Sequence, residues 1–223
     1  MAKIRIIVAD DHTVLRAGLR LLINTQPDME VVSEAADHVQ ALKHCREFRP
    51  TVLTLDMSMP GGNGIQTIQE LCRDCPETRI LVLTMHDAPA YFRMAIASGA
   101  MGYVTKTAAA DELLNAIRHV AAGKVFTHAT LAHDNLAEPT FASQNTALNS
   151  PLESLSERER EVLLQLAQGH TNQAIADQLR LSVKTVESYR ARMMSKLGLQ
   201  NRAELTKFAI ASGLLNSPEI DRS

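Results

Sequence analysis

Short runs of β-branched and aliphatic residues recur through the first half of the chain, and helical patterns separate them. The strand-like runs cover residues 4–9, 30–33, 52–55, 79–83 and 100–104. They are continuously apolar, which is typical of strands buried on both faces. Between them apolar residues recur at helical spacing, as at Leu15, Leu19 and Leu22. These repeated strand–helix units predict an α/β domain in which helices cover both faces of a five-stranded, doubly wound parallel sheet.

The pattern changes after this domain. Residues 123–150 contain Pro, Asn, Ser and Gln without sustained periodicity, which predicts a linker. Over residues 151–216 apolar positions return at helical spacing, in short segments separated by capping signals, so we predict a small all-α domain. The capping signals are Ser156 with Glu159, Gly169, Ser182, Gly198, and Asn201 with Glu204.

Two of these helices are joined by Arg180-Leu181-Ser182, which suggests a helix-turn-helix, although the turn lacks the glycine often found there. In the second helix Val186, Met193 and Leu197 share an apolar stripe. Polar side chains project away from this stripe: Lys184, Thr185, Ser188, Arg192 and Lys196. A recognition helix needs this layout, because its first residues reach base edges while later cations hold phosphates. The alternative is a helical packing module with a solvated charged face.

Composition and charge narrow the classes of protein. The 223 residues are 45% hydrophobic and 22% charged, typical of two folded domains, and no segment is apolar and long enough to cross a bilayer. The chain begins directly with a strand pattern instead of a signal peptide, so we expect a cytoplasmic protein with no membrane partner. Residues 1–150 contain 13 Lys and Arg against 16 Asp and Glu (net −3), and residues 151–223 contain 10 against 9 (net +1). Bulk charge therefore does not establish nucleic-acid binding.

Polar residues follow the predicted strands at the points where the strands end. They are Asp10, Asp11, Asp56, Thr84 and Lys106. Because the carboxyl ends of parallel strands meet at one edge of a sheet, we expect these side chains to converge. Three carboxylates offer the hard oxygen ligands that Mg²⁺ prefers. Lys106 would neutralise a phosphoryl oxygen, Thr84 would donate to another, and Asp56 would be the nucleophile.

Each of these residues alone has an ordinary structural explanation. Asp56 is also a suitable turn residue, Asp10 and Asp11 are suitable at the start of a helix, and Lys106 is a plausible solvated loop cation. Five polar positions on four strand ends, all directed to one edge, favour a shared site.

These motifs resemble the receiver domain of two-component response regulators over residues 3–122. The matching residues are Asp10-Asp11, Asp56 followed by Met57-Ser58-Met59-Pro60-Gly61, Thr84, Tyr103 and Lys106. The resemblance implies a flavodoxin-like fold and Mg²⁺-dependent phosphorylation of Asp56 by a sensor histidine kinase or a small phosphodonor. It also implies that Asp10, Asp11, Asp56 and the Ser58 backbone carbonyl hold the metal. Thr84 and Tyr103 would then move toward the phosphoryl group.

The second domain resembles the LuxR/NarL-type DNA-binding domain. The matching segments are residues 155–163, Gly169 with residues 171–176, Leu181-Ser182, Thr185-Val186 and Lys196-Leu197-Gly198. Glu187 and Tyr189 depart from the Lys and His that are frequent at their positions. The resemblance implies a transcription regulator, not an enzyme, that binds promoter half-sites as a homodimer. The candidates for DNA contact are Lys184, Thr185, Ser188, Arg190, Arg192 and Lys196.

Two enzyme classes stay open as alternatives. Phosphatases of the haloacid dehalogenase type also use an aspartate nucleophile and Mg²⁺ at a strand end, but they need a second aspartate two residues on, where this chain has Ser58. Cys72 and Cys75 have the spacing of a redox or zinc-binding pair. They close a helical segment before Pro76, and no second cysteine pair exists, so we interpret them as ordinary helix-end thiols.

Overall fold

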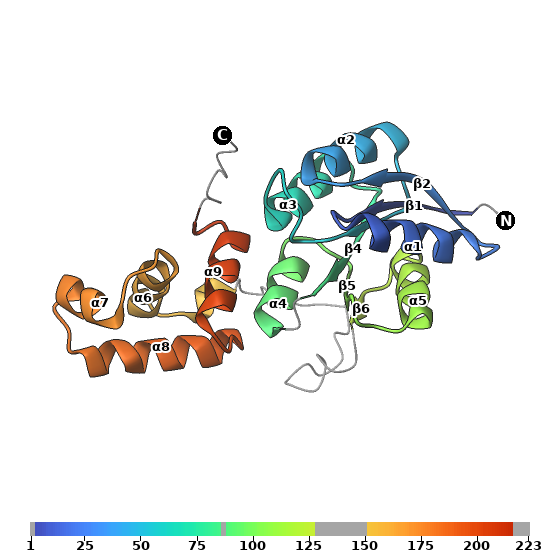
Figure 1. Ribbon diagram of the computed structural model, residues 1–223. Helices are drawn as coiled ribbons and strands as arrows, with labels where there is room; N and C mark the ends of the chain where they lie inside the picture. Colours follow the sequence, from blue (N-terminus) through green and yellow to red (C-terminus); the bar gives the residue numbers. More distant parts are fainter. Residues whose placement is uncertain (1–2, 86–87, 128–150, 216–223) are drawn as a thin grey trace, which may run out of the picture. The chain divides into compact units, whose positions relative to one another are not determined.

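The structure is a computed structural model that describes residues 3–85, 88–127 and 151–215, and these residues form two compact units (Figure 1). The first is an α/β unit built on one sheet, and the second is helical. Most of the predicted linker, residues 128–150, and the last predicted residue of the second domain, Asn216, lie outside the described residues. Among the described helices, none is both long and apolar enough to span a bilayer.

The sheet of the first unit is parallel throughout, in the order β2-β1-β3-β4-β5-β6. Its strands are β1 Ile4–Ala9, β2 Met29–Ala35, β3 Val52–Leu55, β4 Arg79–Thr84, β5 Gly102–Thr105 and β6 Phe126–Thr127. The five predicted strands are confirmed. The edge strand β6 lies inside the range predicted as linker, so the start of that range belongs to the sheet. Two residues are too few to show a period of alternation, and the sequence therefore did not indicate β6.

Helices cover both faces of the sheet (Figure 1). They are α1 Thr13–Asn24, α2 His38–Phe48, α3 Gly64–Asp74 and α5 Ala110–Ala121. α4 Pro89–Ala97 follows β4 in the chain, and its residues up to Met94 fall in the second compact unit. α1 and α5 lie on one face, where Ile6 and Val8 of β1 pack into a core with Leu19 of α1. α2 and α3 lie on the other face. Ile7, between Ile6 and Val8, is equally buried, which explains why β1 is continuously apolar from Ile6 to Ala9.

The second unit is a set of short helices around one small core. They are the 3₁₀ helix η1 Pro151–Ser154 and the α-helices α6 Glu157–Ala167, α7 Asn172–Leu179, α8 Val183–Leu197 and α9 Arg202–Ala211. The predicted stripe of Val186, Met193 and Leu197 on α8 is fully buried. The all-α prediction for this region is therefore confirmed.

The helix ends follow the predicted capping signals with one difference. At α6, Glu159 N donates to Ser156 Oγ over 3.3 Å and Ser156 N donates to the Glu159 carboxylate over 2.8 Å, which completes the capping box. At α9, Asn201 caps the helix by accepting from Glu204 N. The Glu204 carboxylate, however, accepts from Gln200 N at 2.7 Å, one residue before the expected donor. The second box is thus only half formed.

The turn between α7 and α8 forms without a glycine. Arg180 adopts the left-handed conformation there, with φ of 54°. Ser182 then caps α8 by accepting a hydrogen bond from Thr185 N at 3.1 Å. A left-handed arginine is less favourable than a glycine, but the cap and the buried stripe of α8 hold the turn in place. The helix-turn-helix geometry therefore does not require the missing glycine.

Candidate functional site

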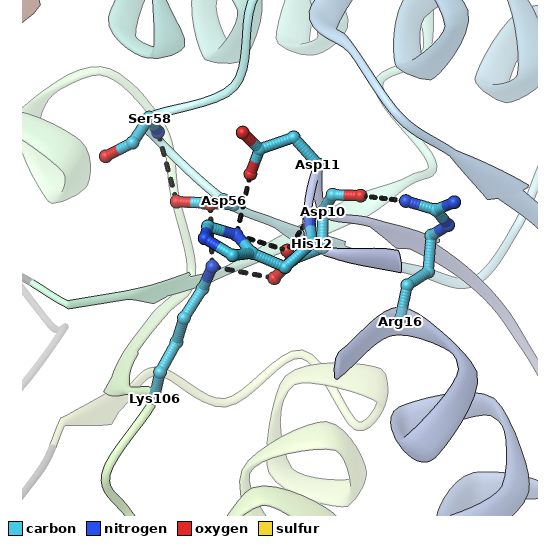
Figure 2. A network of polar contacts seen from close by, with 7 residues as sticks. All are labelled: Asp10, Asp11, His12, Arg16, Asp56, Ser58 and Lys106. Atoms are coloured by element: carbon cyan, nitrogen blue, oxygen red, sulfur yellow. Dashed lines mark hydrogen bonds and ion pairs between the residues drawn. The ribbon is translucent and has the colours of Figure 1, made fainter. Parts of the chain in front are cut away.

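The residues that follow β1, β3 and β5 converge at the carboxyl edge of the sheet (Figure 2). Backbone pairing explains why: Asp56 N donates to the Ala9 carbonyl, and Lys106 N donates to the Thr84 carbonyl. These bonds extend the sheet pairing by one residue beyond the ends of β3 and β5. Asp10, Asp56 and Lys106 converge in the structure, as predicted.

Lys106 places one ammonium group between two buried carboxylates. Its Nζ lies 2.7 Å from Asp56 Oδ2 and 2.8 Å from Asp10 Oδ2. The side chains are 4% exposed for Lys106, 2% for Asp56 and 1% for Asp10. Burial alone would lower the pKa of Lys106, but its hydrogen bonds and ion pairs with the two aspartates outweigh burial and raise that pKa. Lys106 is therefore held in its charged form.

The loop after β3 supports Asp56 from the other side. Ser58 N donates to Asp56 Oδ1 over 3.0 Å, while Asp56 Oδ2 receives Lys106 (Figure 2). A carboxylate has about four acceptor positions, so each oxygen retains capacity for a further ligand. Asp56 is thus oriented by two donors from two different loops, which fixes the direction of its oxygens.

His12 and Arg16 also belong to this network, although we had not predicted them. His12 Nδ1 lies 2.8 Å from Asp11 Oδ1 and 3.2 Å from Asp10 Oδ1. Arg16 donates to the Asp10 carbonyl oxygen, and its Nε lies 3.4 Å from Glu34 Oε2. The signal in the sequence was weak: His12 directly follows the two acids, and Arg16 comes one helical turn later. Neither position indicates by itself that a side chain turns back to the strand end.

The pocket fits a divalent cation. One ligand atom from each of Asp10, Asp11, His12 and Asp56 lies within 4.8 Å of the others. Asp10 Oδ2 is buried and faces Lys106 Nζ at 2.8 Å, and the described residues offer it no second donor. A buried carboxylate oxygen of this kind has an acceptor position available for a metal. The three carboxylates suit Mg²⁺, which prefers oxygen ligands.

Thr84 and Tyr103 are both buried at the neighbouring strands β4 and β5. Thr84 pairs with Thr105 in the register of the sheet, and its carbonyl oxygen accepts from Lys106 N. Tyr103 pairs with Val82, two residues further from the pocket. The structure thus places Thr84 beside the pocket, and the movement of both residues toward a phosphoryl group stays a prediction.

The second unit presents an exposed polar stripe on α8. Lys184, Ser188 and Arg192 are exposed and follow one another at intervals of four residues, so they lie on one side of the helix. The Arg192 guanidinium lies 5.1 Å from the centre of the Tyr189 ring, a cation–π contact that fixes its direction. Thr185 is half-buried at the margin of this stripe. Arg190 is also half-buried, but it comes four residues after Val186 and so flanks the buried stripe instead.

Lys196, another candidate for DNA contact, has a partner within its own unit. Its Nζ lies 2.7 Å from Glu159 Oε2 and 3.1 Å from the Ser154 carbonyl oxygen. Glu159 is almost fully buried, and it is also the acid of the capping box of α6. The structure therefore gives Lys196 a stabilising role that the sequence did not indicate. Its contact with DNA stays a prediction.

The cysteines are not joined by disulfides. Cys45, Cys72 and Cys75 are free thiols. Burial raises the pKa of all three, that of Cys45 to about 12, so little reactive thiolate is present at neutral pH. Cys75 caps the end of α3, in agreement with its interpretation as a helix-end thiol.

Comparison with known families identifies both units. Residues 6–118 match the response regulator receiver domain, and residues 153–209 match the bacterial regulatory proteins of the luxR family. The chain therefore belongs to the two-component response regulators that join a receiver domain to a LuxR-type DNA-binding domain.

Individual relatives agree with this assignment. The oxygen regulatory protein NreC of Staphylococcus aureus is 41% identical over 214 residues, which are 95% of this chain and 99% of that protein. The structure of RcsB from Salmonella enterica serovar Typhimurium, bound to promoter P1flhDC with the phosphomimetic BeF₃⁻, is 29% identical, covers 94% of this chain and 99% of its own, and has a TM-score of 0.78. A LuxR-family response regulator from Aurantimonas sp. SI85-9A1 is 37% identical over 59% of this chain, with a TM-score of 0.56.

Proposed function

We propose that phosphorylation of Asp56 regulates the binding of this chain to DNA. The observation that supports this most directly is the buried pairing of Lys106 with both Asp56 and Asp10. A buried cation beside a carboxylate at a strand end is suited to a group that gains negative charge. Phosphorylation of a receiver aspartate and binding to DNA are both properties of the family to which the chain belongs.

In the transfer step an Asp56 carboxylate oxygen attacks the phosphorus of the donor. A new P–O bond forms, and the P–N bond to the histidine of a sensor kinase breaks with its electron pair leaving on the imidazole. Lys106 balances the charge of the phosphoryl oxygens, and the Thr84 hydroxyl donates to one of them. Asp10, Asp11, Asp56 and the Ser58 carbonyl would hold Mg²⁺, which when bound neutralises part of the phosphoryl charge.

The output belongs to the helical unit. In this proposal the receiver comprises residues 3–122 together with β6, the remainder of residues 123–150 forms the linker, and residues 151–216 bind DNA through α8. Phosphorylation favours a homodimer on paired promoter half-sites, as RcsB dimers bound to DNA suggest for a relative that is 30% identical. Because the target is genomic DNA, we place the protein in the cytoplasm.

Incubation with acetyl phosphate and Mg²⁺ tests the input step. Intact-mass spectrometry should detect one added phosphoryl group in the wild type and none in Asp56→Ala. Lys184→Ala, far from the pocket in sequence and on the other unit, is the control and should be phosphorylated like the wild type. Omission of Mg²⁺ should slow the reaction.

The same preparation distinguishes the regulator from a phosphatase. A phosphatase would show sustained turnover of phosphomonoesters that is lost in Asp56→Ala. Such turnover would contradict the proposal, as would a wild-type level of phosphorylation in the Asp56→Ala variant.

A further inference from the structure

We propose that Glu187 makes the helical unit select cytosine at one position of its DNA half-site, by accepting a hydrogen bond from the N4 amino group of that base. The inference rests on the proposed binding of DNA through α8. It adds a residue that determines sequence preference to the cations that supply affinity. Glu187 stands where lysine is frequent in the family, so this preference belongs to the present chain.

Glu187 lies in the part of α8 that approaches the bases. It is the fifth residue of the helix, it is exposed, and it follows Lys184 by three residues, so the two side chains are neighbours on the helix surface. The N-terminal residues of a recognition helix contact base edges in the major groove, whereas cations further along hold phosphates. Glu187 is therefore placed to read a base.

Among the residues that the structure describes, no hydrogen bond or ion pair engages the carboxylate of Glu187. Other acids of the same unit do have partners: Glu159 pairs with Lys196, and Glu161 pairs with Arg158, each over 2.7 Å. An ion pair between Lys184 and Glu187 would have the less favourable order, because an acid interacts better with a base that follows it along a helix. The carboxylate is thus available to a ligand.

The hydroxyl groups beside Glu187 are already engaged by the helix. Thr185 Oγ1 lies 2.7 Å from Ser182 Oγ, and Ser188 Oγ donates to the Lys184 carbonyl over 2.9 Å. Within residues 183–189 the charged side chains are Lys184 and Glu187. This part of α8 therefore offers DNA a strong donor and a strong acceptor side by side.

The chemistry of the base edges selects cytosine. Phosphates repel a carboxylate, so Glu187 gains binding energy only where a base offers it a donor. In the major groove those donors are the N4 amino group of cytosine and the N6 amino group of adenine. Adenine also carries the acceptor N7 beside its amino group, which repels a carboxylate, whereas cytosine has no acceptor on its own edge. Guanine and thymine present acceptors and are rejected.

Selection from a random DNA library by the full-length, acetyl phosphate-treated chain tests the inference. The wild type should select a half-site with a cytosine that Glu187→Ala no longer selects, while the other preferred bases stay the same. Replacing this C·G pair by T·A in one half-site should weaken wild-type binding about tenfold in fluorescence anisotropy, and should change the binding of Glu187→Ala by less than about twofold.

Glu157→Ala is the matched control. Glu157 is an exposed acid of the same unit, on α6, and its loss changes the net charge equally. Both variants should bind non-specific DNA at least as tightly as the wild type, because each removes a charge that phosphates repel. This measurement also shows that Glu187→Ala is folded. Glu157→Ala should retain the preference for cytosine.

Two outcomes overturn the inference. The same selected half-site for the wild type and Glu187→Ala would mean that Glu187 points to solvent or acts on phosphates alone. Loss of a preference for a base other than cytosine in Glu187→Ala would mean that the carboxylate does not accept from N4. Failure of the proposed function is distinguishable, because the wild type would then enrich no sequence from the library at all.

Discussion

At the scale of single residues, Lys106 determines the electrostatics of the pocket. Its ammonium group faces two carboxylates that are as buried as itself. Removing water from three charged groups is costly, and the mutual attraction of the charges offsets that cost only while all three are present. The pocket is therefore sensitive to the loss of its one lysine.

Lys106→Ala tests this dependence. In the absence of divalent cations the free energy of unfolding should fall by about 3 kcal/mol, because two buried carboxylates lose their shared cation. Added Mg²⁺ should restore more stability to the variant than to the wild type, since the metal replaces the missing positive charge. Urea denaturation with and without EDTA measures both effects. An unchanged stability in EDTA would contradict this account.

Gly62, in the loop after β3, packs so closely against His38 that it has little room for a side chain. A Cβ added at Gly62 would lie 3.0 Å from the Cβ of His38, which is itself buried. Gly62→Ala should therefore lower the free energy of unfolding by about 1–2 kcal/mol, as overpacking does. Most of this loss should disappear when Gly62→Ala is measured in a His38→Gly background. Gly18→Ala, where nothing lies within 4 Å, is the control and should stabilise α1 slightly.

The test depends on the coupling energy between the Gly62→Ala and His38→Gly substitutions. If the urea midpoint falls equally in the His38 and His38→Gly backgrounds, the two residues do not restrict one another. In that case the absence of a side chain at Gly62 has another cause.

At the scale of elements, α8 combines a buried stripe with an exposed cationic one. Lys184 and Arg192 are two turns apart on the exposed side, with Ser188 between them. Replacing both cations by alanine should weaken DNA binding and reduce the slope of log affinity against log salt by about 0.9 for each phosphate that the helix no longer neutralises. Fluorescence anisotropy over a salt series measures both. Binding unchanged at matched salt would exclude this stripe as the surface that binds DNA.

Lys196 on the same helix should respond differently, because it pairs with Glu159. Burial would raise the pKa of Glu159, but hydrogen bonds from Lys196 and Ser156 outweigh burial and lower it below the usual value of 4.5. Folded Glu159 thus holds its proton less tightly than unfolded Glu159. Its contribution to stability is present above pH 4.5 and is lost as the pH falls through the lowered pKa.

Lys196→Met should therefore destabilise the helical unit at pH 7 by about 1–2 kcal/mol, the strength of a charged hydrogen bond reduced for the partial exposure of Lys196. The difference from the wild type should narrow as the pH falls below 4.5, because Glu159 then becomes protonated in both proteins. Hydrogen exchange of the α6 and α8 amides measures the stability of this unit. A difference that does not depend on pH would indicate poorer packing instead of a missing ion pair.

The elements also explain which features could be predicted from sequence. Asp10, Asp56 and Lys106 were predicted to converge because the carboxyl ends of parallel strands must share one edge. The pairing of Lys196 with Glu159 could not be predicted, since it joins two helices 37 residues apart and depends on how they pack. His12 was missed for a related reason: its ring turns back onto the strand end, and only the loop geometry determines that direction.

At the scale of the whole molecule, the chain combines an input unit and an output unit, each with its own core. The proposed phosphorylation would change charge only at Asp56, so an effect on DNA would require a change in the assembly or availability of the helical unit. A dimer with two recognition helices binds paired half-sites much more tightly than a single one, because the second contact is intramolecular. Phosphorylation should therefore raise the affinity for DNA with paired half-sites more than the affinity for a single half-site.

DNA selected from a random library by the acetyl phosphate-treated protein should contain paired half-sites at a fixed spacing. On such DNA, phosphorylation should raise the apparent affinity by about 100-fold, as expected when a second linked contact forms, but it should hardly change binding to a single half-site. Asp56→Ala should show neither the increase nor the acetyl phosphate-dependent dimer in analytical ultracentrifugation. If phosphorylation raised affinity equally for single and paired half-sites, the switch would act by exposing α8 within one chain, and dimerisation would not be its mechanism.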